Sequence, residues 1–219
     1  MKIKSLLFVL CLLAVPASAQ HLQLKAGGGL STQYGSARSV GAYRFGVGYE
    51  MELDQHWSVA PALLFYGKGW KAPDALVPVL DDGGLPVLDE EGNQTYSLMS
   101  RSVAAGYLEL PLLVNYYHRL AAQRYLVFSA GPYVAYGVSG KVKTKGDARR
   151  QGSEKLFYEE NTFDIDEARR FDAGIQVAAG YQFPSKITLS LEADFGLVRF
   201  APGGGRNLSA LVGLTYTFD

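Results

Sequence analysis

The stretch ITLSLEADFGLV, Ile187–Val198, decides the fold, because its apolar and polar residues alternate almost without error. The stretch NLSALVGLTYTF, Asn207–Phe218, repeats the pattern, and so does Phe171–Phe183. A period of two residues places the apolar side chains on one face of a β-strand and the polar ones on the other. Segments of about ten residues with this period are typical of a transmembrane β-barrel.

Eight such strands are predicted along the chain, and the linkers between them alternate in length. The strands are Leu22–Leu30, Val40–Leu53, Trp57–Trp70, Ser102–His118, Arg124–Val142, Phe171–Phe183, Lys186–Val198 and Arg206–Phe218. Tight linkers at Asp54–His56, Arg119–Gln123 and Pro184–Ser185 alternate with longer ones at Ser31–Ser39, Lys71–Arg101, Lys143–Arg170 and Arg199–Gly205. The sequence therefore predicts an all-β fold: an eight-stranded antiparallel up-and-down barrel in the outer membrane, with a filled polar lumen and periplasmic termini.

The N-terminus predicts export. Lys2 and Lys4 precede the short apolar stretch Leu6–Val15, and Ala17–Ala19 offers a small-residue cleavage site. We therefore expect residues 1–19 to be a signal peptide and residues 20–219 to form one barrel domain. Cys11, the only cysteine, lies within the signal, so disulfides and thiolate chemistry are excluded from the mature chain. The mature net charge of about −2 gives no reason to expect nucleic acid as a partner.

The polar faces of the predicted strands carry isolated charges among small residues. Nine of these charges are assigned to a network inside the lumen, and they are Lys25, Arg44, Glu50, Glu52, Lys68, Glu109, Asp172, Glu192 and Asp194. Eight strands enclose an interior just wide enough for side chains to fill, so a general porin is unexpected. The acidic excess is compatible with a narrow cation path, but a buried plug of ion pairs is the favoured interpretation.

A soluble ligand-binding barrel would show the same alternation, with its apolar face inward. The small, sparsely charged polar faces and the asymmetry of the loops favour the membrane protein. Aromatic residues near the ends of the apolar faces, such as Tyr43, Trp57, Tyr136 and Tyr216, would then form interfacial girdles.

Three prolines lie inside predicted strands: Pro61, Pro111 and Pro132. Proline lacks the N–H group that a strand donates to its neighbour, so it belongs at edges or bulges. We therefore expect β-bulges at these three positions.

Four blocks of sequence carry a family resemblance: Tyr107–Val114 (YLELPLLV), Gly131–Tyr133 (GPY), Phe171–Gly174 (FDAG) and Leu211–Phe218 (LVGLTYTF). Together they resemble the PorT-like outer-membrane β-barrel domain of Bacteroidota, over nearly the whole mature chain. The resemblance implies an eight-stranded barrel and, for PorT itself, a role in gliding motility and protein secretion. Asp219 follows the final aromatic residue, which departs from the usual terminal assembly signal.

Catalysis finds little support in the sequence. A lipid-modifying barrel enzyme would need a histidine with a serine and a carboxylate near the outward rim. The three histidines, His21, His56 and His118, all lie at the predicted periplasmic end. We expect no catalytic residues, no metal site and no cofactor.

The two longest loops carry opposite charge patterns. The first is acidic and contains Asp81, Asp82, Asp89, Glu90 and Glu91, whose spacing departs from that of a calcium-binding loop. The second begins with the basic residues Lys141, Lys143, Lys145, Arg149 and Arg150 before it becomes acidic, so it either folds back as a hairpin or meets lipopolysaccharide phosphates.

The sequence thus predicts a non-enzymatic, monomeric outer-membrane barrel that acts through its loops in surface interaction or as an accessory of envelope or secretion assembly. Its expected partners are outer-membrane lipid and lipopolysaccharide, with other envelope or secretion proteins as a further possibility. The alternatives are a lipid-modifying barrel enzyme and a secreted soluble ligand-binding barrel.

Overall fold

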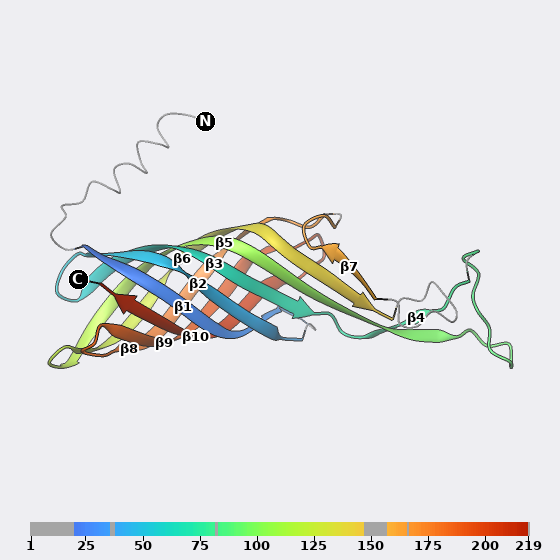
Figure 1. Ribbon diagram of the computed structural model, residues 1–219, viewed down its shortest axis with the longest axis horizontal. Helices are drawn as coiled ribbons and strands as arrows, with labels where there is room; N and C mark the ends of the chain where they lie inside the picture. The colour runs from blue at the N-terminus through green and yellow to red at the C-terminus, as the bar shows by residue number, and fades with distance from the viewer. Residues whose placement is uncertain (1–19, 36–37, 82, 147–156, 166, 219) are drawn as a thin grey trace, which may run out of the picture.

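The computed structural model describes residues 20–35, 38–81, 83–146, 157–165 and 167–218, and within them it contains ten strands (Figure 1). The strands are β1 (Gln20–Gln33), β2 (Val40–Glu52), β3 (Trp57–Lys71), β4 (Ala75–Pro78), β5 (Tyr96–Ala121), β6 (Arg124–Lys145), β7 (Phe157–Asn161), β8 (Phe171–Gln182), β9 (Ile187–Arg199) and β10 (Arg206–Thr217). The predicted signal peptide, residues 1–19, lies outside the described residues. No helix in the described part of the chain is long and apolar enough to cross a membrane.

Eight of these strands close into a ring. All neighbours are antiparallel, in the order β1, β2, β3, β5, β6, β8, β9 and β10, and the pairing of β1 with β10 closes the ring. Each strand thus finds a partner on both sides, as the hydrocarbon of a membrane demands, where an unpaired backbone group costs several kcal/mol. The predicted eight-stranded up-and-down barrel is confirmed.

The two ends of the barrel differ as the linker lengths predicted. Tight turns join β2 to β3, β5 to β6 and β8 to β9 at the end where β10 terminates (Figure 1). At the opposite end β5 and β6 continue well beyond the ring, and β4 pairs with the outermost part of β5 (Figure 1). Both β4 and β7 lie in segments that the sequence pattern predicted as loops. β7 pairs with the end of β6, so the second loop does fold back on its preceding strand.

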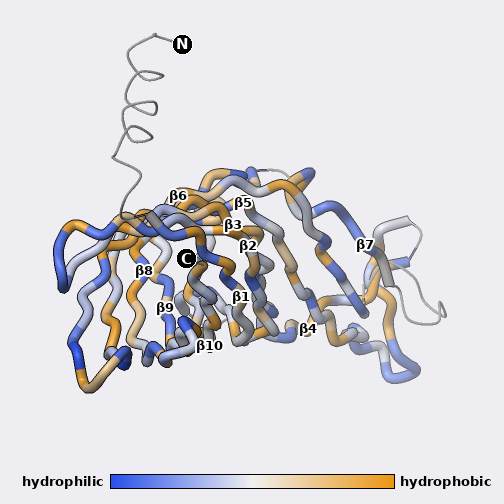
Figure 2. The backbone as a smooth tube through the Cα atoms, turned by 60° about the vertical axis from the view of Figure 1, so that its left-hand side comes forward, coloured by the Kyte–Doolittle hydropathy of each residue, from blue (hydrophilic) through white to orange (hydrophobic). Residues whose placement is uncertain are grey.

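The side chains alternate between a buried lumen and an exposed outer wall. Hydrophobic and hydrophilic residues follow one another along the barrel strands (Figure 2). Along β9, Leu189, Leu191 and Leu197 are 47%, 68% and 57% exposed, whereas Asp194 is 1% exposed. An outer wall of leucine, valine and aromatic side chains suits lipid and would be unfavourable in water. The soluble ligand-binding alternative therefore fits the chain poorly.

The expectation of bulges at the three prolines is wrong. Pro61 pairs opposite Leu112, Pro111 opposite Tyr133 and Pro132 opposite Ile175, with the register unchanged on either side. The fixed φ of proline is compatible with an extended strand, so the sheet tolerates a missing N–H donor without inserting an extra residue. The register shifts occur elsewhere, at Gly106/Tyr107 and Arg119/Ala121 between β5 and β6, and at Arg206/Leu208 between β10 and β9.

Closure of the ring depends on a close approach at Gly29 of β1. A Cβ atom there would lie 2.1 Å from the carbonyl oxygen of Ala210 on β10, whereas a Cβ on the adjacent Gly28 would meet nothing within 4 Å. We expect Gly29→Val to abolish the closed barrel and Gly28→Val to preserve it, because only the first forces β1 and β10 apart. The measurement is the mobility shift between boiled and unboiled protein on a denaturing gel, and an unchanged shift for Gly29→Val would contradict this account of closure.

Candidate functional site

Lys68 of β3 lies at the centre of a buried charge cluster in the lumen. Its Nζ donates to Glu109 Oε2 of β5 at 2.8 Å and lies 3.5 Å from Asp172 Oδ2 of β8. The rings of Tyr66 and Tyr133 each have their centroid 4.4 Å from the same Nζ. Two carboxylates and two aromatic faces surround one buried ammonium group, and they compensate for its loss of hydration.

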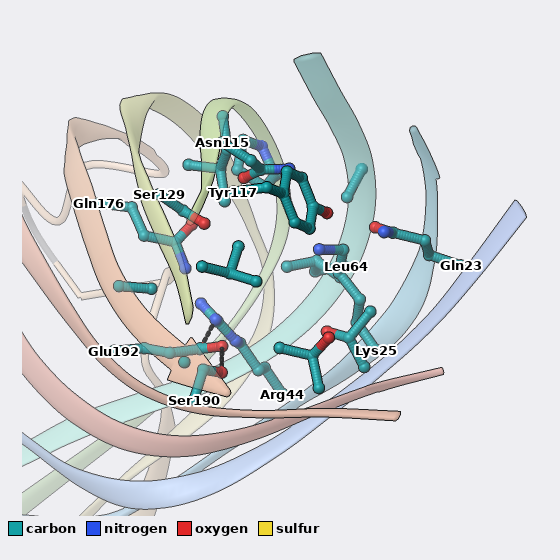
Figure 3. A pocket seen from close by; sticks show the side chains of 18 residues that line it. Gln23, Lys25, Arg44, Leu64, Asn115, Tyr117, Ser129, Gln176, Ser190 and Glu192 are labelled. Carbon is teal, nitrogen blue, oxygen red and sulfur yellow. Dashed lines mark hydrogen bonds and ion pairs between the residues drawn. The ribbon is translucent and has the colours of Figure 1, made fainter. Parts of the chain in front are cut away.

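Arg44 of β2 forms the second cluster, next to the first, because its guanidinium lies 5.8 Å from the centroid of the same Tyr66 ring. Its guanidinium makes an ion pair with Glu192 and lies 3.8 Å from Asp194, both on β9 (Figure 3). Gln176 of β8, with its amide oxygen turned toward Arg44, accepts from Nη2 at 2.7 Å. Ser190 donates to Glu192 at 2.7 Å. The arginine thus ties β2 to β8 and β9 across the barrel.

Glu50 of β2 is held by neutral donors and makes no ion pair in the described residues. Its Oε1 accepts from Ser58, Asn115 and Tyr117 at 2.5, 3.1 and 2.5 Å, and its Oε2 accepts from Gln23 at 2.6 Å. Four hydrogen bonds to one carboxylate offset much of its loss of hydration. The Glu50 carboxylate therefore needs no cation of its own, unlike Glu109 and Glu192, which pair with Lys68 and Arg44.

The other two residues assigned to the lumen differ from this pattern. Lys25 points into a small polar cavity of about 50 Å³ beside Gln23 and Arg44 (Figure 3). Glu52 lies outside the buried network, because its side chain is 56% exposed and sits 3.6 Å from His21 at the tight-turn end. With Glu52 at the mouth, the interior holds three bases against five acids, so the acidic excess is smaller than the sequence predicted.

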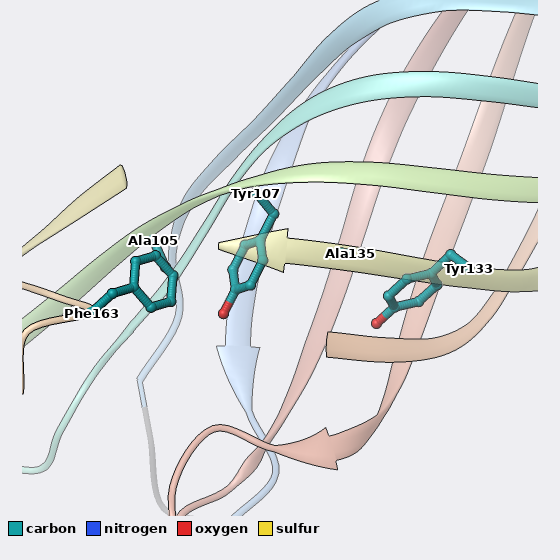
Figure 4. Packing of buried hydrophobic residues seen from close by; sticks show 5 residues of the cluster. All are labelled: Ala105, Tyr107, Tyr133, Ala135 and Phe163. Carbon is teal, nitrogen blue, oxygen red and sulfur yellow. The ribbon is translucent and has the colours of Figure 1, made fainter. Parts of the chain in front are cut away.

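Aromatic side chains close the lumen at the long-loop end. Phe163, between β7 and β8, packs edge-on against Tyr107 at 5.7 Å between ring centroids and lies directly over Gly137 (Figure 4). Phe200 lies between β9 and β10, and its ring centroid is 6.3 Å from that of Phe163 and 4.8 Å from that of Trp70. We call Trp70, Phe163 and Phe200 the aromatic cap. Two separate loops thus fold inward over the ion pairs.

The tight-turn end is open and contains a cavity of about 670 Å³. His21 and His56 line it, whereas His118 is exposed on β5. His56 stacks on Tyr116 with centroids 6.3 Å apart, and His21 contacts Glu52. No group of three His, Cys, Asp or Glu side chains in the described part of the chain converges as a metal site would require.

Beyond the barrel, the acidic loop forms a set of paired strands and hairpins that we call the arm, described over residues 72–81 and 83–101. β4 and the start of β5 form a two-stranded ribbon, in which Leu76 pairs opposite Leu98. Two small hairpins follow, bridged at Leu80/Pro86 and at Leu88/Gln94. Their bases are joined by a cycle of three backbone hydrogen bonds of 2.9 Å each, from Val87 N to Val79 O, from Thr95 N to Val87 O and from Val79 N to Thr95 O. The arm is a three-way junction of β-ribbons.

Two of the predicted acidic interaction residues shape the arm itself. Asp81 Oδ1 accepts from the amides of Gly83 and Leu85 at 2.9 and 2.8 Å. Asp89 Oδ1 accepts in the same way from Glu91 and Asn93 at 3.0 and 2.8 Å. Such Asx turns fix the tight reversal of each hairpin. Glu90 and Glu91 stay exposed at one tip, and Asp82 lies outside the described residues.

Two lysines of the predicted basic block share one carboxylate. Glu159 of β7 accepts from Lys141 at 2.8 Å and lies 3.0 Å from Lys143, both on the outer face of β6. The ammonium group of Lys141 is the main reason why the pKa of Glu159 is lowered. Lys145 continues the same face, whereas Arg149 and Arg150 lie outside the described residues.

The sequence patterns did not predict the cap or the arm, although each left a signal. Phe163 and Phe200 are large apolar residues inside polar linkers, which is where a loop anchored inward would need them. In the arm, Val79-Leu80-Asp81 recurs eight residues later as Val87-Leu88-Asp89.

Residues 18–200 match the model of the family described as the outer membrane protein beta-barrel domain. The chain belongs to this family. The barrel therefore resides in the outer membrane. Barrels of this kind have short periplasmic turns and longer extracellular loops, so we infer that the tight turns face the periplasm and the arm and cap face outward.

Solved structures similar to this outer-membrane barrel include the attachment invasion locus protein Ail of Yersinia pestis in complex with the heparin analogue sucrose octasulfate. It is 11% identical, with 91% of this chain and 97% of that chain covered and a TM-score of 0.41. The Neisserial surface protein A, NspA, is 9% identical, with 93% and 100% covered and a TM-score of 0.38. Comparison with curated proteins gives no match.

We expect Lys68→Met to destabilise the outer-membrane barrel by about 3–5 kcal/mol, because it leaves the buried Glu109 and Asp172 without their cation. Lys141→Met is the matched control, since Lys141 makes a contact of the same 2.8 Å length to Glu159 with its side chain 68% exposed. The control should change stability little. The measurement is the urea midpoint for loss of the heat-modifiable form, and equal effects of the two variants would contradict a structural role for the buried cluster.

We expect Asp89→Ala to accelerate proteolysis of the arm several-fold, whereas Asp89→Asn, which keeps an acceptor oxygen but loses the charge, should accelerate it to a smaller extent. The amide of Asn93 is the largest cause of the lowered pKa of Asp89. The carboxylate therefore stabilises its turn above the unfolded Asp pKa of about 3.9, and this contribution is lost as the pH falls through the lower folded value. The rate at which an acid-tolerant protease cleaves the wild-type arm should therefore rise as the pH falls through this value. A ratio of cleavage rates between wild type and Asp89→Asn that does not change with pH would contradict the role of the carboxylate.

Proposed function

We propose that this protein is a sealed, non-enzymatic outer-membrane barrel that presents its arm to a protein partner at the cell surface. The observation that carries the proposal is a set of large apolar side chains left exposed on ordered ribbons of the arm, namely Leu76, Leu85, Leu88, Tyr96 and Leu98 at 56–69% exposure. Lipid covers the equally exposed side chains of the barrel wall. The arm projects beyond the barrel, so lipid does not reach it.

The ribbon of the arm has one apolar face. Leu76 lies opposite Leu98, and Pro78 lies opposite Tyr96, so all four side chains point to the same side. Exposed leucine and tyrosine side chains that stand together on a rigid element are typical of a protein interface. The ribbon is also an edge, because β4 pairs only with β5 and its other side has no neighbour in the described residues.

The interior supports anchoring over transport. The clusters around Lys68 and Arg44 fill the middle of the lumen, and the aromatic cap covers its outer end. The cavity of about 50 Å³ beside Lys25 has room for water molecules only. This favours the ion-pair plug over the narrow cation path.

A lipid-modifying enzyme finds less support in the same geometry. His21 and His56 line the periplasmic cavity, far from the outer leaflet where the lipid substrate of such an enzyme lies. The proposal therefore includes no catalytic residue.

A role as an accessory of envelope or secretion assembly, as the PorT-like resemblance implies, is part of this proposal. The residues that carry the resemblance have structural places in the barrel. Tyr107 and Glu109 belong to the buried surroundings of Lys68, and Leu108 and Leu110 face lipid. These residues thus support the barrel fold that the PorT-like resemblance implies, and their side chains are taken up by the lumen or by lipid. We therefore assign the partner contact to the arm.

The test is photocrosslinking in intact cells from a reactive residue placed at Leu98, compared with one placed at the lipid-facing Leu197. We expect one discrete protein adduct from Leu98 and none from Leu197. Leu76→Ser, which removes the side chain opposite Leu98, should reduce the yield about fivefold or more if it costs about 1 kcal/mol of binding.

Two outcomes would contradict the proposal. One is the absence of any protein adduct at Leu98 while the barrel remains heat-modifiable. The other is a change in lipid A structure, read by mass spectrometry, when His21, His56 and His118 are replaced by alanine, which would favour the enzyme.

A further inference from the structure

Two arginines face each other on the outer wall of the barrel near its extracellular rim. Arg199 ends β9, Arg206 begins β10, and the two are direct partners in the antiparallel register. Both are exposed, and each continues an outward apolar row, which contains Leu197 on β9 and Leu208 on β10. Their neighbour Asn207 points the other way and donates to Asp172 in the lumen at 2.9 Å.

Nothing within the described residues neutralises this pair. Neither guanidinium takes part in an ion pair or a side-chain hydrogen bond there, in contrast to Lys141 and Lys143, which share Glu159. Like charges placed directly opposite each other in a sheet are unfavourable. The arrangement is therefore expected to depend on an anion supplied from outside the chain.

The height of the pair coincides with the membrane boundary. From Tyr216 near the periplasmic end to Arg206 the strand advances about ten residues, or about 34 Å, which a tilt of about 40° converts to a height of about 26 Å. The apolar band of such barrels is about 25 Å tall. Arg206 thus lies just beyond the hydrocarbon.

A second observation gives the same level. Gly174 pairs with Gly196, and Phe171 and Arg199 each lie three residues further out on their strands, so the two residues lie at similar heights. Phe171 in turn pairs with Tyr136, and both are more than half exposed on the outer wall. Aromatic side chains of this kind mark the headgroup region.

A third cation stands close to the pair. The backbone amide of Arg169 donates to the carbonyl of Phe200 at 2.8 Å, next to Arg199, and its side chain is exposed. Within the described residues its guanidinium makes no ion pair, whereas that of the adjacent Arg170 lies 3.6 Å from Asp164.

We propose that Arg199 and Arg206, with Arg169 beside them, form a site for the phosphate group of an outer-leaflet lipid headgroup. Planar guanidinium groups donate in pairs to phosphate oxygens, and two of them on adjacent strands can hold one phosphate from both sides. The row of Phe195, Leu197 and Leu208 directly below takes the acyl chain of the same lipid. The site lies on the barrel wall, so it does not depend on the function of the arm.

The experiment is a titration of the full-length barrel, purified in a mild non-ionic detergent, with diphosphoryl lipid A. Binding is read as the rise in the temperature at which the heat-modifiable form is lost. We expect Arg199→Gln with Arg206→Gln to weaken the apparent affinity about tenfold or more, because two charge-assisted contacts are lost. Arg199→Lys with Arg206→Lys should bind at an intermediate level, because charge remains without bidentate geometry.

The matched control is Lys141→Gln with Lys143→Gln, which removes the same charge from the same outer wall. It should bind lipid A as the wild type does, because both lysines are already paired with Glu159. The same lipid without its phosphates, and inorganic phosphate alone, should each fail to raise the transition temperature.

Three results would overturn the proposal. An equal loss in the two glutamine variants would show a general effect of charge. Equal binding of the dephosphorylated lipid would exclude phosphate recognition. Stabilisation by inorganic phosphate at the same concentration would point to a free anion site instead of a lipid site. Heat-modifiability of each variant without ligand confirms that it is folded.

Discussion

Closure of the sheet between β1 and β10 is the constraint on which the rest of this structure depends. A membrane tolerates no unpaired strand edge, and eight strands close at a radius that leaves little more than side-chain volume inside. The charges that alternation places in the lumen must therefore be satisfied within a few ångströms. Lys68 finds two carboxylates and two tyrosine rings, Arg44 finds Glu192 and Gln176, and Glu50 finds four neutral donors. The polar network in the lumen is therefore a consequence of the narrow closed ring of strands.

The two-residue period of the sequence was enough to predict most of the fold, because each strand has one face toward lipid and one toward the lumen. Side-chain direction was therefore predictable, and Arg44, Lys68, Glu109 and Asp172 are buried on the lumen side. Glu52 shows the limit of this reasoning. It has the parity of a lumen residue, but it stands so near the end of β2 that its side chain reaches the periplasmic mouth. Alternation predicts which face of the strand a side chain lies on, but it does not predict how deep in the lumen the side chain lies.

Long-range packing of loops was beyond the reach of the sequence patterns. Phe163 lies in a largely polar stretch of sequence, and its burial comes from contacts with residues far away in the chain, among them Gly137, Tyr107 and Phe200. The same holds for acidic residues. Asp81 and Asp89 read as surface charge, yet their first partners are amides of their own turns. The prolines led to a wrong prediction of a different kind. The missing N–H donor suggested β-bulges, but proline fits an extended strand without one.

The cycle of hydrogen bonds among Val79, Val87 and Thr95 has a consequence for how this surface changes over generations. Each hairpin leaves the junction and returns to it, so the amide of Val79 and the carbonyl of Thr95 stay 2.9 Å apart however much chain is inserted between them. A unit of about eight residues can be gained, lost or rewritten without altering the register of β4 on β5 or the ring below. Such an arm allows the outermost surface to change piece by piece while the barrel below it keeps its structure.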